Sequence, residues 1–175
     1  MSHDMSDASD RAAPARLRGL PSRLLAHVAM QADRLVSDRL AGADARKWHY
    51  AVLVALRESG PASQAELSRL TGIYRSDMVA LLNELAERGL VERAPDPADR
   101  RRNVISMTEL GRDRLTRLDG LVDDVQDELL APLTGPERDQ LVGLLGRLRD
   151  HHSRSPQCWA KTGKSRGVGA CRHTS

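Results

Sequence analysis

The fold of this chain is decided by residues 63–89, which read SQAELSRLTGIYRSDMVALLNELAERG. The first four residues form a capping box, in which the Ser63 hydroxyl accepts the amide of Glu66 and the glutamate side chain accepts the serine N–H. A helix is therefore predicted to begin at Ser63. Thr71-Gly72 ends it, because glycine adopts the positive φ that a tight turn between helices requires.

A second helix is predicted over residues 74–88, ending at Gly89. Four apolar residues at helical spacing predict its buried face: Met78, Leu81, Leu82 and Leu85. The opposite face carries small or polar side chains that leave room for a DNA major groove: Ser76, Val79, Ala80, Asn83 and Glu87. A helix, a glycine turn and a second helix are together typical of a helix-turn-helix.

Two short strands are predicted to follow as an antiparallel hairpin. Residues 90–93 are bounded by prolines, and residues 103–107 alternate and are rich in β-branched side chains. Their connection ends in Asp99-Arg100-Arg101-Arg102. Three arginines at a hairpin tip have no core to pack against, which indicates a wing that contacts DNA. The alternative interpretation is a solvated run of charge.

Three runs in this part of the chain carry a family resemblance. They are Leu-Ala-Glu-Arg-Gly-Leu-Val-Glu-Arg at residues 85–93, Asp-Pro-Ala-Asp-Arg-Arg at 96–101 and Met-Thr-Glu-Leu-Gly at 107–111. Together they resemble the MarR family of transcriptional regulators (multiple antibiotic resistance regulators), over about residues 20–148. The resemblance implies an obligate homodimer. Its two recognition helices would reach half-sites about 10 base pairs apart on a pseudo-palindromic operator.

Helices are predicted on both sides of this unit. Residues 20–40 form an amphipathic helix with an apolar stripe of Leu24, Leu25, Val28, Ala32, Leu35 and Val36. Asp44 is the expected cap of the next helix, which runs to about residue 59 and points Trp48, Val52, Leu53, Ala55 and Leu56 inward.

Two more helices are predicted after the hairpin. Thr108 is the expected N-cap of a long helix whose apolar face holds Leu110, Leu115, Leu118, Leu121, Val122, Val125 and Leu129. Thr134-Gly135-Pro136-Glu137 is a second capping box, and it opens a helix with a stripe of Leu141, Leu144, Leu145 and Leu148. The order ααααββαα predicts a mainly α winged helix-turn-helix with a small β-hairpin wing and N- and C-terminal dimerisation helices.

Three parts are expected along the chain: a disordered arm over residues 1–18, the winged helix-turn-helix domain with its dimerisation helices over 19–150, and a basic disordered tail over 151–175. The formal charge is +3, but the tail holds five basic and no acidic residues, and without it 22 basic residues face 24 acidic ones. A DNA hypothesis therefore rests on geometry and not on net charge.

The sequence also bears on location. No apolar run approaches the ~20 residues of a membrane span, and the N-terminus has no apolar block like that of a secretory signal. We therefore expect a cytoplasmic protein with no membrane partner. Cys158 and Cys171 both lie in the tail, which argues against a disulfide or a thiol sensor in the core.

The candidate DNA contacts lie in the helix-turn-helix and in the wing: Ser63, Gln64, Arg75, Ser76, Val79, Ala80, Asn83, Asp99, Arg100, Arg101 and Arg102. The family resemblance implies that Arg101 enters the minor groove, where narrow A·T stretches concentrate negative potential, and that Asp99 orients an arginine.

The recognition helix departs from the family at two positions. Relatives often carry Thr followed by Arg or Lys where this chain has Val79-Ala80, so the obvious bidentate donor to guanine is missing. Base contacts are then expected from Arg75, Ser76 and Asn83, or from methyl contact to thymine. For Asn83 the alternative is an ordinary exposed polar residue.

A pocket for an aromatic acid is expected between the dimerisation helices and the DNA-binding module, with His27, Trp48 and His49 as candidates. The alternative is that Trp48 is simply a core residue. No metal site is expected, since His151 and His152 are adjacent and cannot face the same way on a helix. No cofactor is expected either.

These patterns predict a homodimeric repressor that binds double-stranded DNA and is released by a small aromatic or phenolic ligand. One alternative is a ligand-independent repressor or architectural protein whose pocket is empty. Another is a protein-interaction adaptor that keeps the fold. An enzyme is not expected, because the chain has no glycine-rich phosphate loop, no GxSxG and no carboxylate pair with a buried pattern.

Overall fold

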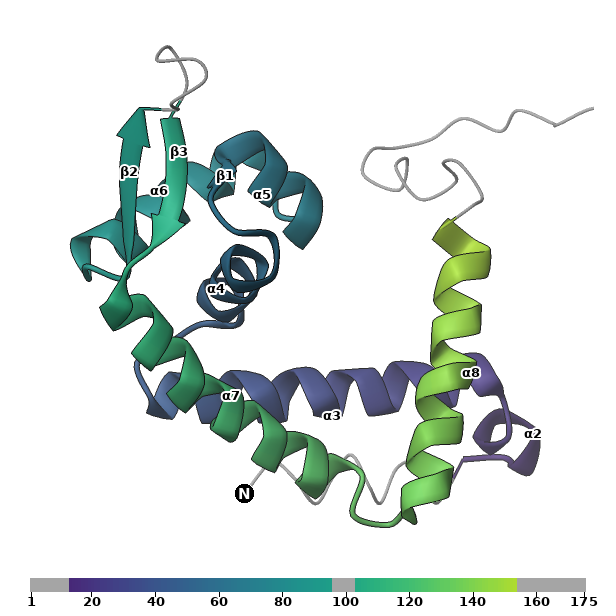
Figure 1. Ribbon diagram of the computed structural model, residues 1–175. Coiled ribbons are helices and arrows are strands. Elements are labelled where there is room, and N and C mark those ends of the chain that lie inside the picture. The colour runs from purple at the N-terminus through teal and green to yellow at the C-terminus, as the bar shows by residue number, and fades with distance from the viewer. Residues whose placement is uncertain (1–12, 96–102, 154–175) are drawn as a thin grey trace, which may run out of the picture. The chain divides into compact units, whose positions relative to one another are not determined.

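The structure is a computed structural model that describes residues 13–95 and 103–153. The chain divides into two compact units, Met1–Leu129 and Leu130–Ser175. The elements of the first unit are α2 (Ala15–Arg18), α3 (Pro21–Gly42), α4 (Lys47–Ser59), β1 (Ala62–Ser63), α5 (Gln64–Thr71), α6 (Arg75–Glu87), β2 (Val91–Pro95), β3 (Asn103–Met107) and α7 (Glu109–Leu129) (Figure 1). The second unit contains α8 (Gly135–Ser153).

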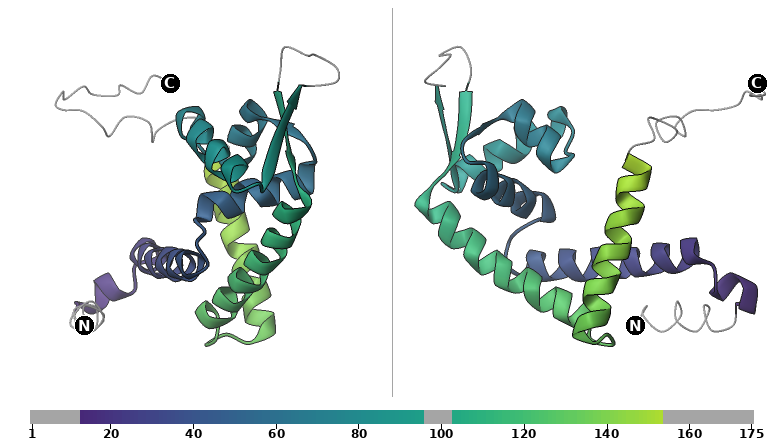
Figure 2. Two further views of the ribbon diagram at one scale, coloured as in Figure 1. Left: turned by 90° about the vertical axis from the view of Figure 1, so that its left-hand side faces the viewer. Right: turned by 45° about the vertical axis from the view of Figure 1, so that its right-hand side comes forward.

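The sheet has three antiparallel strands in the order β1-β3-β2. Strands β2 and β3 pair from Val91 opposite Met107 to Pro95 opposite Asn103, as the predicted hairpin requires. Strand β1 adds Ala62 opposite Ile105. Strand β1 was not predicted, because two residues are too few to show an alternating pattern. The ends of β2 and β3 that lead to residues 96–102 point away from α7 in all views (Figures 1 and 2).

The core of the first unit lies where α4, α5, α6 and α7 meet the sheet. All four residues predicted for the inner face of the recognition helix are buried in it, and they pack against buried apolar side chains of the other elements. Its fully buried residues include Leu40, Val52, Leu53, Leu67, Met78, Leu82, Leu85, Leu115 and Leu118. The fold class predicted from the sequence is confirmed.

The predicted helix ends are largely confirmed. Ser63 Oγ accepts the amide of Glu66 at 3.3 Å, and Gly72 follows α5 with φ 72°. Thr108 Oγ1 accepts the amide of Gly111 at 3.0 Å at the start of α7. Ser63 and Thr108 accept first-turn amides that have no partner within the helix, and Gly72 supplies the left-handed end. Short-range sequence signals were therefore sufficient to place these ends.

Helix α4 differs from its prediction in two ways. It begins at Lys47 with Arg46 as N-cap, so Asp44 does not cap it. Asp44 instead adopts a left-handed backbone with φ 49°. Trp48 was expected to point inward but is 46% exposed, whereas His49 is 2% exposed. Val52, Leu53 and Leu56 are buried as predicted, so only the first turn of α4 differs. His49 takes the inward position there because a partner for its imidazole lies elsewhere in the chain.

Three further differences concern the long helices and the ends of the chain. Leu110 was predicted on the buried face of α7 but is exposed, because it lies at the outer end of the helix beside Gly89. Residues 15–18, expected to be part of a disordered arm, form α2. Helix α8 runs three residues beyond the expected boundary at 150. Both cysteines lie outside the described residues.

Helix α8 has an amphipathic pattern without a covered face. Its N-terminus is capped as predicted, since Glu137 Oε2 accepts the amide of Thr134 at 2.8 Å, and hydrogen bonds from Thr134 hold the pKa of Glu137 below its ordinary value. Within the described residues, α8 buries no side chain. On α3, the stripe residues Leu24, Leu25 and Val28 are also exposed. Among the described residues, no helix is long and apolar enough to cross a membrane.

Candidate DNA-binding interface

The outer face of α6 presents five of the predicted DNA contacts together. Its inner face is anchored in the core, so the residues a half-turn away must face solvent. Each of them is exposed: Arg75, Ser76, Val79, Ala80 and Asn83. Ser63 and Gln64, at the start of α5, are half-buried. The structure therefore brings the predicted residues of the helix-turn-helix to one side of the domain.

A groove between α5 and α6 adds residues that the sequence analysis did not identify. Its lining includes Arg69 and Tyr74 beside the predicted Arg75. Tyr74 is 79% exposed at the N-cap position of α6, and Arg69 is exposed on α5. Arginine and tyrosine side chains are frequent donors to DNA phosphates. Tyr74 could have been selected from the sequence, because it is an aromatic residue directly before the predicted recognition helix.

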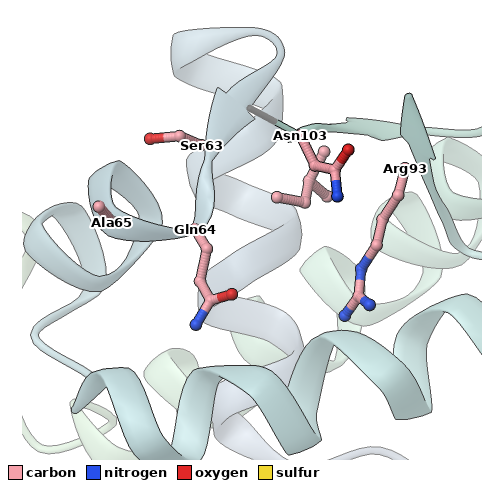
Figure 3. Close-up of a pocket in the computed structure, with 6 residues that line it drawn as sticks. Ser63, Gln64, Ala65, Arg93 and Asn103 are labelled. Carbon is pink, nitrogen blue, oxygen red and sulfur yellow. The ribbon is translucent and has the colours of Figure 1, made fainter. Parts of the chain in front are cut away.

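A second pocket joins the start of α5 to the hairpin (Figure 3). The side chains of Gln64 and Arg93 extend in the same direction in Figure 3, and both reach α6. Gln64 Nε2 donates to the carbonyl of Arg75 at 3.3 Å. An Arg93 guanidinium N–H donates to Asn83 Oδ1 at 2.7 Å. These two bonds attach the recognition helix to the element before it and to the strand after it.

The bond from Arg93 bears on the role of Asn83. An asparagine reads adenine with its oxygen and its nitrogen together, the oxygen accepting N6–H and the nitrogen donating to N7. In this structure the Asn83 oxygen already accepts from Arg93. The arrangement suits Asn83 to orient Arg93 better than to read a base. Arg93, the residue that donates this hydrogen bond to Asn83, was not among the predicted DNA contacts.

A buried histidine connects α4 to α6. His49 Nε2 lies 3.0 Å from Glu84 Oε2, and His49 Nδ1 accepts the amide of Arg46 at 3.3 Å. Because Nδ1 accepts, the neutral tautomer with hydrogen on Nε2 fits both contacts. Arg46 also pairs with Glu84. Hydrogen bonds from Arg46 and His49 lower the pKa of Glu84 from its ordinary value.

The surroundings of His49 predict a pH dependence of stability. Burial lowers its pKa below 6.5, and the positive charges of Arg46 and Arg88 act in the same direction, while Glu84 opposes them. The unfolded chain therefore takes up the proton first. We expect the free energy of unfolding to decrease as pH falls below about 6.5, until the folded-state pKa is passed.

Urea unfolding between pH 7.5 and 5.5 measures this effect. His49→Gln should lower the stability at pH 7.5 and flatten its dependence on pH, because the titrating group is gone. His152→Gln removes an exposed histidine and should leave the wild-type slope in place. An unchanged slope in His49→Gln would show that another group causes the pH dependence.

The three ligand-pocket candidates do not share an environment. Trp48 lines a pocket of about 310 Å³ whose other lining residues include Arg46, Tyr74, Ala80 and Glu84. His49 is buried with both ring nitrogens hydrogen-bonded, so a ligand would have to break an existing contact to use it. His27 lies on α3, one of the long helices. The four wing residues Asp99, Arg100, Arg101 and Arg102 lie outside the described residues.

Comparison of the sequence with known proteins points to one family. A family model described as the MarR family matches residues 43–102. The HTH-type transcriptional repressor NicR of Pseudomonas putida is 32% identical over 101 residues, which are 58% of this chain and 64% of NicR. The matching region thus spans a little less than two thirds of that relative.

Two solved structures share the fold over most of the chain. A MarR variant from Escherichia coli complexed with operator DNA is 27% identical with a TM-score of 0.66, and the match covers 78% of this chain and 99% of that one. CouR from Rhodococcus jostii bound to p-coumaroyl-CoA is 29% identical with a TM-score of 0.66, and the match covers 77% of this chain and 95% of CouR.

Proposed function

The chain belongs to the MarR family of transcriptional regulators, and from this premise we propose that it is a homodimeric repressor of a pseudo-palindromic operator. The family consists of transcriptional regulators, so the expectation that the chain is not an enzyme is confirmed. We further propose that a small aromatic or phenolic ligand releases it from DNA. The p-coumaroyl-CoA bound to CouR supports an aromatic ligand.

The observation that carries the proposal is the solvent-exposed outer face of α6. Five small, polar or basic side chains lie exposed along it, between the groove of α5 and the hairpin. Apart from Arg75 at the N-terminal end of α6, these side chains are short enough for the helix to enter a major groove. Val79 and Ala80 supply methyl groups for thymine, and Arg75 and Ser76 supply donors at the N-terminal end of the helix, where recognition helices contact bases.

Phosphate contacts are assigned to residues around this face. Arg69 and Tyr74 line the groove on one side of α6, and Arg93 lines the pocket between the start of α5 and the hairpin. Contacts of this kind determine the position of a protein on the duplex and carry no sequence information themselves. Base selection then falls to the outer face of α6 and to the wing.

The proposed dimer supplies a second recognition helix for the other half-site of the operator. The exposed apolar stripes of α3 and α8 are the surfaces available for a partner subunit, since water-exposed leucine stripes are unfavourable. A two-fold axis would place two copies of α6 about one DNA turn apart. An imperfect inverted repeat beside the gene for this protein is the operator that this arrangement predicts.

Fluorescence anisotropy with that inverted repeat tests the proposal. We expect specific binding to the repeat and release by an aromatic acid or its thioester. Tight binding that no such ligand changes would select the ligand-independent alternative. Equal binding to the repeat and to a scrambled duplex would contradict the operator proposal.

The wing gives a sharper prediction. Arg101→Ala should weaken operator binding by on the order of 1 to 3 kcal/mol, and more than Arg102→Ala. The reason is that Arg101 holds the family's minor-groove position and Arg102 adjoins the strand, where a phosphate contact is expected. Loss of a phosphate contact weakens binding to all duplexes alike, whereas loss of a groove arginine removes the preference for A·T-rich flanks.

Titration of both variants against operators with A·T and G·C flanks, at one salt concentration, separates the two roles. Arg102→Ala should keep the wild-type flank preference and serves as the matched control. If Arg101→Ala also keeps that preference, the assignment of the groove arginine is wrong.

A further inference from the structure

Val79 is an apolar residue exposed near the middle of the outer face of α6. With Ser76, Ala80 and Asn83 it has the i, i+3, i+4, i+7 spacing of one helix face. The side chain of Val79 is 45% exposed. Neither Val79 nor Ala80 is among the buried and half-buried side chains that form the core of the first unit. Packing in the core therefore does not account for a branched apolar residue at this position.

Two polar residues on the same face, one turn before and one turn after this valine, already have hydrogen-bond partners in the chain. Ser76 Oγ donates to Asp77 Oδ1 at 3.2 Å, and Asn83 Oδ1 accepts from Arg93 at 2.7 Å. Bidentate reading of adenine requires the oxygen and the nitrogen of an asparagine together, and the oxygen of Asn83 is in use. The middle of the outer face of α6 therefore offers a base an apolar contact.

Ala80 extends this apolar surface on one side. It borders the pocket that contains Trp48, so it lies toward the edge of the face that is next to α4. Its single methyl group also offers less apolar area than the isopropyl group of Val79. Val79 is therefore the side chain on which an apolar contact to a base mainly depends.

The major groove of unmodified DNA presents one apolar group at its base edges, the methyl group on C5 of thymine. An isopropyl group that leaves water is stabilised against this methyl group and not against the neighbouring donors and acceptors. 5-Methylcytosine carries a methyl group on the same ring carbon. The two pyrimidines differ at C4, where thymine has an oxygen and cytosine an amino group, and valine has no polar atom that could distinguish them.

We propose that α6 selects a base pair by the methyl group on C5 of a pyrimidine, with Val79 as the contacting residue, so that 5-methylcytosine can replace thymine in the operator. Cytosine methylation at the contacted position then strengthens binding, whereas unmodified cytosine there weakens it. The affinity of the chain for a duplex thus depends on a chemical modification of the DNA as well as on its sequence.

This inference rests on the proposed function, because α6 must enter a major groove for Val79 to contact a base. The two can fail separately. Specific binding to the operator without any dependence on methyl groups contradicts this inference and leaves the operator proposal intact. Equal binding to the operator and to a scrambled duplex contradicts both.

Removal of single methyl groups from the operator tests the proposal. The probe is the inverted repeat beside the gene, or the duplex that the full chain selects from a random library, and fluorescence anisotropy at one salt concentration gives the affinity. Each thymine of a half-site is replaced in turn by uracil, together with its symmetry mate. Uracil lacks the methyl group and keeps the hydrogen-bonding groups. At the contacted position we expect a loss of roughly fourfold for each methyl group, and so tenfold or more for the symmetric pair.

The position found in this way is then occupied by a cytosine·guanine pair, with and without a methyl group on C5 of the cytosine. We expect the methylated duplex to bind roughly tenfold more tightly than the unmethylated duplex when both half-sites are changed. Methylation of a cytosine outside the half-sites is the control and should not change the affinity.

Val79→Ala connects the effect to the side chain. The change removes two methyl groups from an exposed residue and raises helix propensity, so the fold should be kept, which melting curves verify. The ratio of the affinities for the thymine and uracil operators should fall at least roughly threefold, as expected for two groups in contact. Arg69→Gln is the matched control, because loss of a phosphate contact weakens binding to both operators equally and keeps the ratio.

Three results would overturn the proposal. They are equal affinity for the thymine and uracil operators at every position, equal affinity for the methylated and unmethylated cytosine duplexes, and a wild-type ratio of thymine to uracil affinity in folded Val79→Ala. The third result matters most. An effect of the methyl group on the shape of the duplex alone would not depend on the side chain at residue 79.

Discussion

Gly111→Ala is expected to lower the free energy of unfolding by about 3 kcal/mol, at the upper end of what overpacking costs. Gly111 is buried on the first turn of α7. A Cβ atom built there would lie 2.1 Å from the carbonyl oxygen of Leu90 and 2.8 Å from Met107 Cγ. The first contact is with backbone, which cannot move aside as the end of a side chain can.

The Leu90 carbonyl is itself held in place. It accepts the amide of Thr108 at 3.1 Å, and the Thr108 hydroxyl donates to the neighbouring Gly89 carbonyl at 2.7 Å. The same hydroxyl oxygen caps α7 by accepting the amide of Gly111. Threonine and glycine three residues apart thus join the long helix to the base of the hairpin, and the added methyl group would separate them.

Gly120→Ala is the matched control, because it makes the same change in the same helix. No atom lies within 4 Å of a Cβ built at Gly120, so alanine should raise stability by up to about 1 kcal/mol through its better helix propensity. Urea unfolding of the two variants and the wild type gives the comparison. Equal stability in both variants would show that α7 does not approach Leu90 this closely in solution.

Leu145→Asp is expected to convert the protein to a monomer and to weaken operator binding at least roughly 100-fold, because two linked half-sites bind far more tightly than one. Within the described residues, α8 buries no side chain, and Val142, Leu144, Leu145 and Leu148 are exposed on it. A helix of this kind is stabilised mainly by packing of its apolar face. A charge placed in a subunit interface has no counter-ion and must be desolvated.

Gln140→Asp is the control for this experiment. It adds an aspartate to the same helix about 90° from the leucine stripe, at an exposed residue. Sedimentation velocity at micromolar concentration should show a dimer for the wild type and for Gln140→Asp, and a monomer for Leu145→Asp. Circular dichroism verifies that the helical content is kept. A dimer in Leu145→Asp would show that α8 does not form the subunit interface.

The sequence by itself determined the elements of the helix-turn-helix. The cap at Ser63, the left-handed Gly72 and the apolar spacing of α6 each depend on residues within a few positions of one another, because caps and helical faces are local properties. The same holds for the cap at Thr134 and for the hairpin strands on either side of the wing. The wing arginines and the dimer remain predictions.

Tertiary structure alone decided which side chains meet across the chain. Strand β1 exists because Ala62 and Ser63 pair with β3, and nothing in two residues indicates this. His49 replaces Trp48 on the buried face of α4 because Glu84, 35 residues away, satisfies its imidazole. A buried polar group is stable only with a partner, and the position of that partner depends on how the helices pack.

The same reason explains Asn83, Arg93 and Asp44. From the sequence, Asn83 is an exposed residue on a recognition helix, and its bond to Arg93 exists only because the hairpin folds back beside α6. Asp44 is of a residue type that often caps helices, yet it caps none here. Its carboxylate accepts a hydrogen bond from Arg88 and its carbonyl oxygen accepts one from Arg114, and both arginines are far away in the sequence. Local patterns establish each element, whereas contacts between side chains far apart in sequence depend on distances that only the packed chain sets.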